Sequence, residues 1–278
     1  MLARGRSFHN EAPKWPAPTM KITQLRNATV VLEIGEYRIL VDPMLGAKGE
    51  LPPLKFLGHR ERNPIVELPI VTETILATVT HCLITHCQRG HFDHLDRAGK
   101  QWLRQTQIPV ICTAHDAPYL RQRGLNVIAL VAKHGERQPF LNGTIRTVPC
   151  AHGKGWVGMM MEHGVGYFIE LPGEPTIYLA GDTVLTPEIQ EFVARYEPHI
   201  SLIPAGGAKF DIGSEIIMGI DEAIQFIRSS KGIVVANHME AVGHCPVGRR
   251  ELLFAATNAG VANQLQIPGD GETLAFAL

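Results

Sequence analysis

The sequence predicts an α/β protein built as one large domain. Short β-rich runs alternate with helical segments along most of the chain, and 278 residues are enough to bury one extensive core. The composition, with 45% hydrophobic and 19% charged residues, is that of a globular protein. Residues 1–19 contain prolines, glycines and mixed charges without periodicity, so we expect an N-terminal arm there and a single domain over residues 20–278.

The N-terminal part of this domain has the pattern of a β-meander followed by a long irregular segment. Strands are expected at residues 22–25, 29–34 and 37–41, with Gly35-Glu36 as the turn between the last two. Residues 44–69 are rich in proline, glycine and charge and have no clear period, which is typical of a loop that covers a substrate site. A further strand is expected at residues 77–85.

The rest of the chain alternates in the manner of α/β units. Helices are expected at residues 97–105, 117–123, 186–195, 220–227 and 249–258. Strands are expected at residues 110–113, 126–130, 144–149, 166–171, 176–180, 200–203, 232–236 and 272–277, the last of them at a sheet edge.

Charge and composition argue against several classes of protein. A net charge of −1 gives no broad field that attracts nucleic acid or an anionic membrane, so a small molecule is the expected substrate. No apolar run approaches the roughly 20 residues that span a bilayer, and no secretion signal begins the chain, so we expect a cytoplasmic protein. The five cysteines lack paired C-x-x-C spacing, which argues against a disulfide framework and a zinc ribbon. Assembly into a homo-oligomer is left open.

The candidate chemistry is concentrated in residues 85–96, Thr-His-Cys-Gln-Arg-Gly-His-Phe-Asp-His-Leu-Asp, where three histidines and two aspartates fall within eleven residues. A strand is expected before this segment and a helix after it, so rigid elements hold the loop at both ends. Imidazole and carboxylate ligands suit Zn, Mn or Fe. The spacing of His91, Asp93 and His94 lets neighbouring side chains reach different ions.

This segment resembles the His-x-His-x-Asp-His signature of the metallo-β-lactamase superfamily, whose members are four-layer αββα sandwiches with a dinuclear site at one edge. Two registers are open. In the gapped register, His86 is the first ligand, three residues are inserted, and His91, Asp93 and His94 complete the motif. In the ungapped register, residues 86–91 read His-x-Gln-x-Gly-His, which loses a ligand and the aspartate. We favour the gapped register because residues 91–96 reproduce the second half of the signature and lead directly into a helix.

Three later segments resemble further metal-binding elements of the same superfamily. His152 follows an expected strand and precedes glycines, as at the third metal-binding position. Gly181-Asp182-Thr183 resembles the element whose aspartate bridges both metals, and His238 matches the final ligand. Residues 204–218 resemble the branch that includes L-ascorbate-6-phosphate lactonase.

The resemblance implies two divalent ions, with Zn preferred and Mn or Fe as alternatives. Asp182 would be shared between them. The other expected ligands are His86, His91 and His152 for one ion, and Asp93, His94 and His238 for the other. Two cations would lower the pKa of a water between them toward about 7, and Asp93 or a bound water would pass a proton to the leaving group.

The implied function is a metal-dependent hydrolase of a small ester, lactone or phosphoester. Two alternatives remain open, namely a degenerate family member that binds metal or ligand without turnover, and a phosphodiesterase. A nucleic-acid-processing enzyme would need a basic groove or a clamp domain, and neither the charge nor the length indicates one.

A few side chains outside the ligand set are candidates for substrate binding, namely Arg60, Arg62, Lys154 and His244. The arginines present planar forks to a carboxylate or phosphate, although a solvated basic loop is the ordinary interpretation. Lys154 could bind an anionic substrate or be a surface lysine, and His244 could line the pocket. Asp42, after the third expected strand, could orient the histidine loop or simply form a turn.

Overall fold

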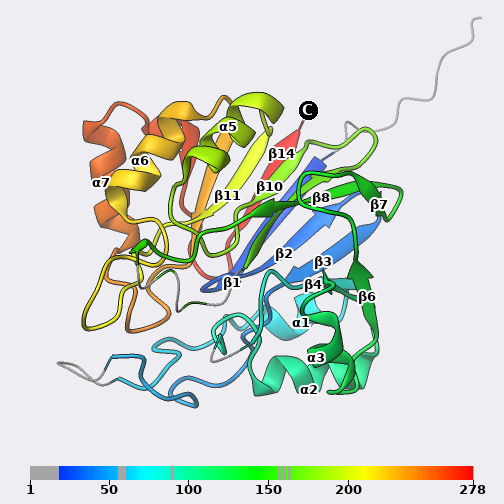
Figure 1. The fold of residues 1–278 in the computed structure, drawn as a ribbon. Helices are drawn as coiled ribbons and strands as arrows, with labels where there is room; N and C mark the ends of the chain where they lie inside the picture. Colours follow the sequence, from blue (N-terminus) through cyan, green and yellow to red (C-terminus); the bar gives the residue numbers. More distant parts are fainter. Residues whose placement is uncertain are drawn as a thin grey trace, which may run out of the picture.

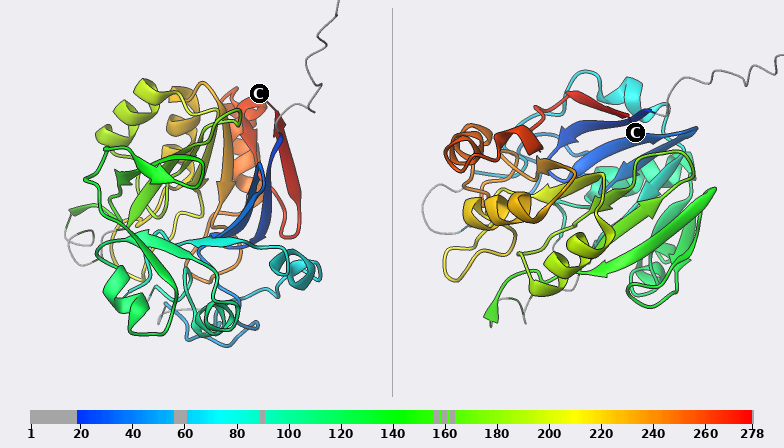
Figure 2. Two further views of the ribbon diagram at one scale, coloured as in Figure 1. Left: turned by 90° about the vertical axis from the view of Figure 1, so that its right-hand side faces the viewer. Right: turned by 90° about the horizontal axis from the view of Figure 1, so that it is seen from above.

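The computed structural model describes residues 19–55, 61–88, 91–155, 158, 161 and 164–277 of the chain. These residues form two seven-stranded sheets that face each other, with helices on the outer sides (Figures 1 and 2). The strand orders are β14-β1-β2-β3-β4-β5-β6 and β13-β12-β11-β10-β9-β8-β7. The predicted αββα sandwich is therefore confirmed.

The first sheet combines the N-terminal part of the chain with its last strand. Its strands are β1 (Thr19–Arg26), β2 (Thr29–Ile34), β3 (Tyr37–Val41), β4 (His81–Leu83), β5 (Val110–Thr113), β6 (Val127–Leu130) and β14 (Thr273–Ala277). Strands β1 to β3 are antiparallel, as expected for a meander, whereas β3 to β6 are parallel. The helices on this side are α1 (Thr72–Leu76), α2 (Arg97–Thr106) and α3 (Ala117–Arg121).

The second sheet holds the remaining strands. They are β7 (Gln138–Phe140), β8 (Gly143–Pro149), β9 (Val165–Glu170), β10 (Ile177–Leu179), β11 (Ile200–Pro204), β12 (Ile233–Asn237) and β13 (Leu265–Gln266). Its outer face is covered by α5 (Pro187–Tyr196), α6 (Ile220–Ser229) and α7 (Arg249–Asn258), with the short 3₁₀ helix η1 (Ala262–Gln264) after α7.

The main core lies between the sheets because each sheet turns an apolar face toward the other. Leu32 and Ile39 of the first sheet belong to one buried cluster with Tyr167 and Leu179 of the second. Separate apolar clusters fill the space between each sheet and its own helices. Because burial of apolar area is the dominant stabilising term in folding, this packing fixes where the strands of both sheets end.

Most element predictions are close, and one is wrong in part. The expected strand over residues 77–85 is only three residues long in the structure, and α1 ends just before residue 77. Residues 77 and 78 form the turn after this helix, because the backbone amides of Ala77 and Thr78 donate to carbonyls of α1 and the Thr78 hydroxyl donates to the carbonyl of Ile75. These local bonds satisfy the backbone groups that a strand would have offered to its neighbours.

The two ends of the described chain lie side by side. Thr19 of β1 pairs with Ala277 of β14, which confirms the expected C-terminal edge strand and places the last residue of the predicted arm within β1. Residues 1–18 of that arm lie outside the described residues. Among the helices that the structure describes, none is long and apolar enough to cross a membrane.

Candidate metal centre

Seven buried side chains converge at one edge of the sandwich, and all seven are predicted ligands. They follow four strands, since residues 86–94 come after β4, residue 152 after β8, residue 182 after β10 and residue 238 after β12. Strands β10, β11 and β12 are parallel, so the loops that follow them leave the second sheet at the same edge. The set comprises His86, His91, Asp93, His94, His152, Asp182 and His238.

The first group of ligand candidates is formed by His86, His91 and His152. One ring nitrogen from each lies within 4.8 Å of the other two. Among the described residues, Nε2 of His86 is buried without a hydrogen-bond partner. Burial lowers the pKa of all three imidazoles, and that of His91 falls to about 4. They are therefore neutral at pH 7, which is the form that binds a metal ion.

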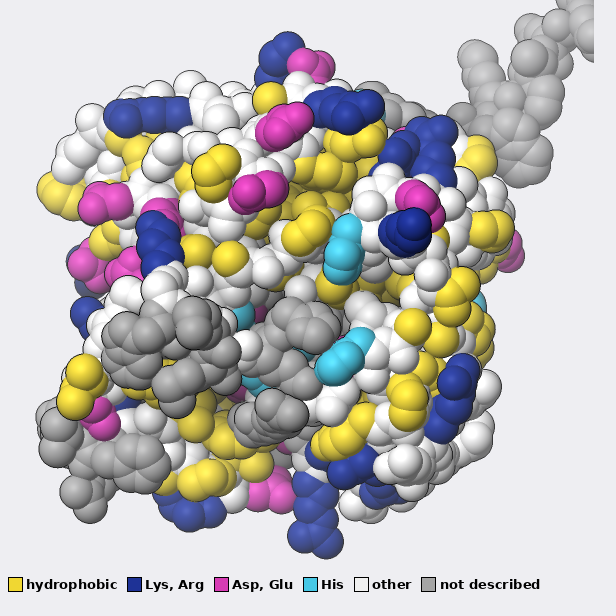
Figure 3. Space-filling view, viewed as in Figure 1, with side chains coloured by type: hydrophobic (Ala, Val, Ile, Leu, Met, Phe, Trp, Pro, Cys, Tyr) yellow, Lys and Arg dark blue, Asp and Glu magenta, His cyan; other side chains and the backbone are white. Residues whose placement is uncertain are grey.

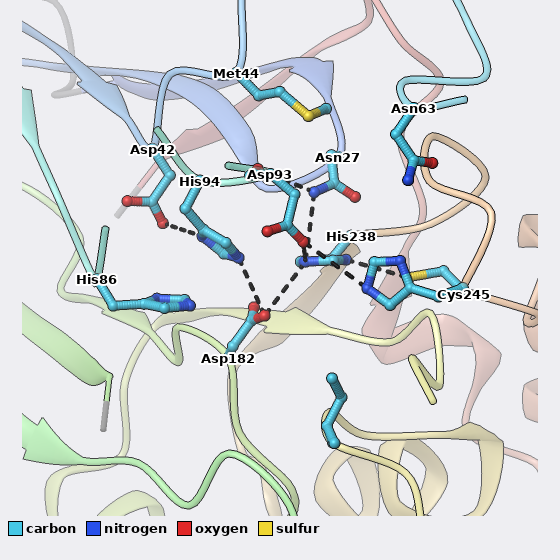
Figure 4. Close-up of polar contacts among 12 residues, drawn as sticks. Asn27, Asp42, Met44, Asn63, His86, Asp93, His94, Asp182, His238 and Cys245 are labelled. Carbon is cyan, nitrogen blue, oxygen red and sulfur yellow. Dashed lines mark hydrogen bonds and ion pairs between the residues drawn. The ribbon is translucent and has the colours of Figure 1, made fainter. Parts of the chain in front are cut away.

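The second group consists of Asp93, His94, Asp182 and His238 (Figure 4). Oδ2 of Asp182 lies 3.0 Å from Nε2 of His94 and 3.4 Å from Nε2 of His238. The same oxygen is 3.6 Å from Nε2 of His152, in the first group. Asp182, a member of the second group, thus also contacts the first group.

Charge within the second group is balanced between imidazoles and carboxylates. Burial lowers the pKa of His94, but the carboxylates of Asp182 and Asp42 outweigh burial and raise the pKa to about 10. Burial raises the pKa of Asp93, yet its contact with His238 and the charge of His94 hold that pKa below its ordinary value. Without an ion, protonated imidazoles would therefore neutralise these carboxylates.

His94 is oriented from behind by Asp42. Nδ1 of His94 lies 2.9 Å from Oδ2 of Asp42, and the same carboxylate accepts hydrogen bonds from the backbone amide and hydroxyl of Thr85. Asp42 has a left-handed backbone with φ 46°, an uncommon conformation for a residue other than glycine. The contact with His94 therefore supports the orienting role of Asp42, because a turn alone would not require it.

Two further ligand candidates are held through their second ring nitrogen. Nδ1 of His152 lies 2.8 Å from the carbonyl oxygen of Ile216, so it is the donor and Nε2 is left to face the other ligands. Nδ1 of His238 lies 3.4 Å from the sulfur of Cys245. Such contacts fix the tautomer and the ring orientation of metal-binding histidines. Cys245 is therefore in contact with a ligand candidate.

Asn27 is a site residue that we did not predict from the sequence. Its side-chain amide donates to the backbone carbonyl of Asp93 at 3.2 Å, and the backbone carbonyl of Asn27 accepts from the backbone amide of His238 at 3.1 Å. It occupies the turn between β1 and β2 with φ 54°. The available signal was an asparagine between two expected strands, because asparagine tolerates this left-handed conformation.

Close packing also fixes the loop that carries His238. A Cβ atom built on Gly206 would lie 2.0 Å from the carbonyl oxygen of His238, so only glycine fits at this position. His238 itself has φ 56°. Strained backbone of this kind is common at functional sites, where the surrounding structure holds it in place.

The structure favours the gapped register of the histidine motif. His91 reaches the first group, with its ring centroid 4.4 Å from that of His86. Gln88, which the ungapped register would align with the second histidine of the signature, donates to Asp116 at 2.8 Å. The three inserted residues therefore lengthen the loop without removing a ligand candidate.

The four substrate-binding candidates have different surroundings. Arg60 lies outside the described residues. Arg62 is exposed and donates to the backbone carbonyls of Gly49 and Glu50, and Lys154 forms an ion pair with Glu222. These two described cations are thus engaged away from the ligand groups, whereas His244 joins the site.

His244 is 3% exposed, and its Nε2 lies 3.9 Å from Oδ2 of Asp93. Burial lowers its pKa to about 4, although the charge of Asp93 acts in the opposite direction.

The donor set fits bound divalent ions. Nε2 of His94 is 3.0 Å from an oxygen of Asp182, yet the two atoms are outside hydrogen-bond geometry. The unpaired Nε2 of His86 lies in the adjoining group. Buried polar atoms are costly to leave unpaired, and two adjacent groups of imidazole and carboxylate atoms are what a dinuclear site requires.

The sequence of this chain matches a family model and several known proteins. A model of the β-lactamase superfamily domain matches residues 37–239. The UPF0173 protein YddR of Bacillus subtilis is 29% identical over 263 residues, which cover 92% of this chain and all of that protein. A UPF0173 metal-dependent hydrolase of Methylacidiphilum infernorum is also 29% identical, over 74% of this chain and 78% of that protein.

Two solved structures are similar over nearly the whole chain. An isothiocyanate hydrolase from Delia radicum gut bacteria has 32% sequence identity and a TM-score of 0.83, covering 93% of this chain and 100% of that one. A protein described as a possible metal-dependent hydrolase from Veillonella parvula has 26% identity and a TM-score of 0.82, covering 93% and 99%.

Proposed function

Because this chain belongs to the metallo-β-lactamase superfamily, and within it to the UPF0173 family of metal-dependent hydrolases, we propose that it is a dinuclear hydrolase of small uncharged substrates with an electrophilic carbon. The position of Asp182 is the main support. Its Oδ2 lies 3.0 Å from His94, in one ligand group, and 3.6 Å from His152, in the other. A carboxylate can span two ions about 3.5 to 4 Å apart.

The two ligand groups would each hold one ion, with Asp182 shared. When bound, the ions supply positive charge that lowers the pKa of water and polarises the substrate. Zn is preferred because most of the donors are imidazoles, and Mn or Fe are the alternatives.

Asp93 is the proposed proton carrier. Its carboxylate is ionised at neutral pH, as that of an aspartate with an ordinary or lowered pKa is, so that it can accept a proton from water and deliver it to the leaving group. The contact of Asn27 with the Asp93 backbone limits how far the carboxylate can move. Asp93 would therefore act as both a ligand and a general base.

The surroundings of the site favour an uncharged substrate over a phosphoester. Arg62 and Lys154, the described candidates for anion binding, are engaged with their own loop and with Glu222. On the face in Figure 3, basic and acidic side chains of the described residues are interspersed. Uncharged esters and lactones fit this setting, and so does the isothiocyanate group in the name of the structural relative.

The reaction can be written for both kinds of substrate. With an ester or lactone, the water oxygen bonds to the carbonyl carbon, the C–O bond to the leaving group breaks, and that oxygen takes a proton. With an isothiocyanate, the water oxygen bonds to the central carbon and the nitrogen takes a proton. The resulting thiocarbamic acid then releases carbonyl sulfide and leaves an amine.

A substrate panel with defined metal content tests the proposal. Protein loaded separately with Zn, Mn or Fe is assayed with phenyl acetate, a γ-lactone, benzyl isothiocyanate and bis(p-nitrophenyl) phosphate, while elemental analysis counts the ions per chain. We expect close to two ions and turnover of at least one carbon substrate. Turnover of the phosphodiester alone would support the phosphodiesterase alternative, and bound metal without any turnover would support the degenerate one.

A further inference from the structure

A small apolar cluster lies directly beside the ligand groups and is separate from the main cores. Its buried members are Met44, Ala208, Ile216, Ile217, Val242 and Cys245, and Leu51, Met161 and Phe210 pack against it while partly exposed. The cluster touches the ligands at two points, through the Ile216 carbonyl bonded to His152 and the Cys245 sulfur beside His238. An apolar surface thus begins where the metal-binding side chains end.

The partly exposed members are held in place by loop contacts. Leu51 exchanges two backbone hydrogen bonds with Asn63, at 2.6 and 3.0 Å. The side chain of Asn63 in turn accepts from the amide of Gly243, in the loop that joins His238 to His244. The loop containing Leu51 is therefore anchored to the same segment as two histidines of the site.

Phe210 and His244 connect the apolar cluster to the reacting groups. Their rings are nearly parallel, with centroids 6.5 Å apart and an interplanar angle of 8°, which is an offset stack. The carbonyl of His244 also accepts a backbone bond from Lys209 at 3.0 Å. Phe210 is thus positioned next to a histidine that faces Asp93.

The proton of His244 is expected on Nε2. Nδ1 is buried without a hydrogen-bond partner among the described residues, so no contact favours a proton there. Nε2 lies 3.9 Å from the Asp93 carboxylate, too far for a direct hydrogen bond but close enough for the negative charge to favour an N–H at that position. The N–H on Nε2 is therefore on the side of the ring that faces Asp93.

We propose that Phe210 and His244 form a substrate-recognition pair, in which the Phe210 ring packs against an apolar group of the substrate and Nε2 of His244 donates a hydrogen bond to a heteroatom of its reacting group. The inference rests on the proposed function and narrows the substrate class to alkyl or aryl derivatives of a carbon electrophile. A substrate with only a methyl group would leave the Phe210 surface uncovered.

The apolar half of the proposal is tested by binding, without turnover. Calorimetry with the metal-loaded protein compares the Kd of acetate with that of phenylacetate, since both carry the same carboxylate and only one carries a ring. We expect phenylacetate to bind about tenfold more tightly than acetate, and Phe210→Ala to reduce this ratio to about threefold or less. Phe254→Ala, which removes a ring that is 70% exposed on α7, is the matched control and should keep the ratio.

An unchanged ratio in Phe210→Ala, or no preference in the unmodified protein, would overturn this half. If the preference exists but no substrate is turned over, the proposed function fails while the recognition surface stands. The two outcomes are therefore distinguishable.

The polar half is tested by three substitutions. His244→Leu should lower kcat/KM for the best panel substrate by about 10 to 100-fold, and His244→Gln, which retains an N–H donor, should recover part of the loss. His134→Leu is the control, since this exposed histidine contacts only Thr147 among the polar contacts described. If His244→Leu instead loses a metal ion, or if Gln restores nothing, the assigned role is wrong. Without turnover, the Kd of phenylacetate serves as the readout for the same comparison.

Discussion

Nδ1 of His94 lies 2.9 Å from Oδ2 of Asp42, inside the protein and behind the ligand groups. The backbone amide and the hydroxyl of Thr85 also donate hydrogen bonds to this carboxylate. The arrangement leaves Nε2 of His94 free to face Asp182, 3.0 Å away. One aspartate outside the ligand set thus determines which nitrogen of His94 is available to an ion.

Replacing Asp42 with asparagine should weaken metal binding while the fold is retained. An amide has one acceptor oxygen in place of two, so it cannot accept all three bonds that Thr85 and His94 make to this carboxylate. We expect a loss of about 10 to 100-fold in metal affinity, which is the usual cost of removing such a partner. Competition with a chromogenic chelator measures the affinity, and Asp221→Asn, at an exposed position on α6, is the control. Equal affinity in both variants would contradict the orienting role.

The Asp182→Asn substitution should abolish turnover and lower the metal content. The amide nitrogen cannot act as a ligand, and the negative charge that contacts both groups is lost. Elemental analysis and the activity panel provide the two readouts. Full metal content together with unchanged activity would rule out the bridging role.

The register of the histidine motif can be tested with one pair of variants. His94→Ala should reduce the metal content, because His94 belongs to the second ligand group, whereas the ungapped register ends at His91 and leaves His94 out. Gln88→Ala should leave it unchanged, since Gln88 bonds to Asp116 instead. Full metal content in His94→Ala would restore the ungapped register.

Replacing Gly206 with alanine should displace His238. The new Cβ would lie 2.0 Å from the His238 carbonyl oxygen, so the loop must move. We expect a destabilisation of about 1 to 3 kcal/mol and a lower metal content. Chemical denaturation and elemental analysis measure the two effects. Gly260→Ala is the comparison variant. An added Cβ at Gly260 would meet no other atom, but φ is 71° there, so this variant measures the effect of backbone strain without a steric clash.

The stability of the metal-free protein should be greatest near pH 6.5. The pKa of His91 is about 4 in the folded protein, so between about pH 6.5 and 4 the unfolded chain binds more protons and stability falls as the pH falls. The pKa of His94 is raised to about 10, so its contribution is present below about pH 6.5 and is lost as the pH rises toward 10.

Thermal unfolding from pH 4 to 10 measures this profile. Protonation of His91 alone should lower the free energy of unfolding by about 3 kcal/mol over the acid range. Bound metal should reduce the alkaline loss, because an ion takes the place of the proton on His94. A melting temperature that rises steadily up to pH 9 in the metal-free protein would contradict the assigned charges.

Local sequence patterns were sufficient for most of the fold. Alternating apolar residues and turn signals located β2, β3 and β5, and the bounds of α7 were predicted as observed. The patterns failed at α1, where side-chain and backbone bonds within one short turn outweigh the β-rich composition of residues 77–80. They also missed β7 and β13, each of three residues or fewer, because such short strands depend on their neighbours for pairing.

The sequence by itself determined the order of the elements and the kinds of ligand that the chain offers. Only the tertiary structure decided that His91 and not Gln88 joins the ligand groups, that Arg62 and Lys154 are engaged elsewhere, and that Asn27 contacts the site. The physical reason is the range of the interactions. Helices and turns are encoded by neighbours in the chain, whereas a site assembled from the ends of four strands depends on how two sheets pack across a shared core.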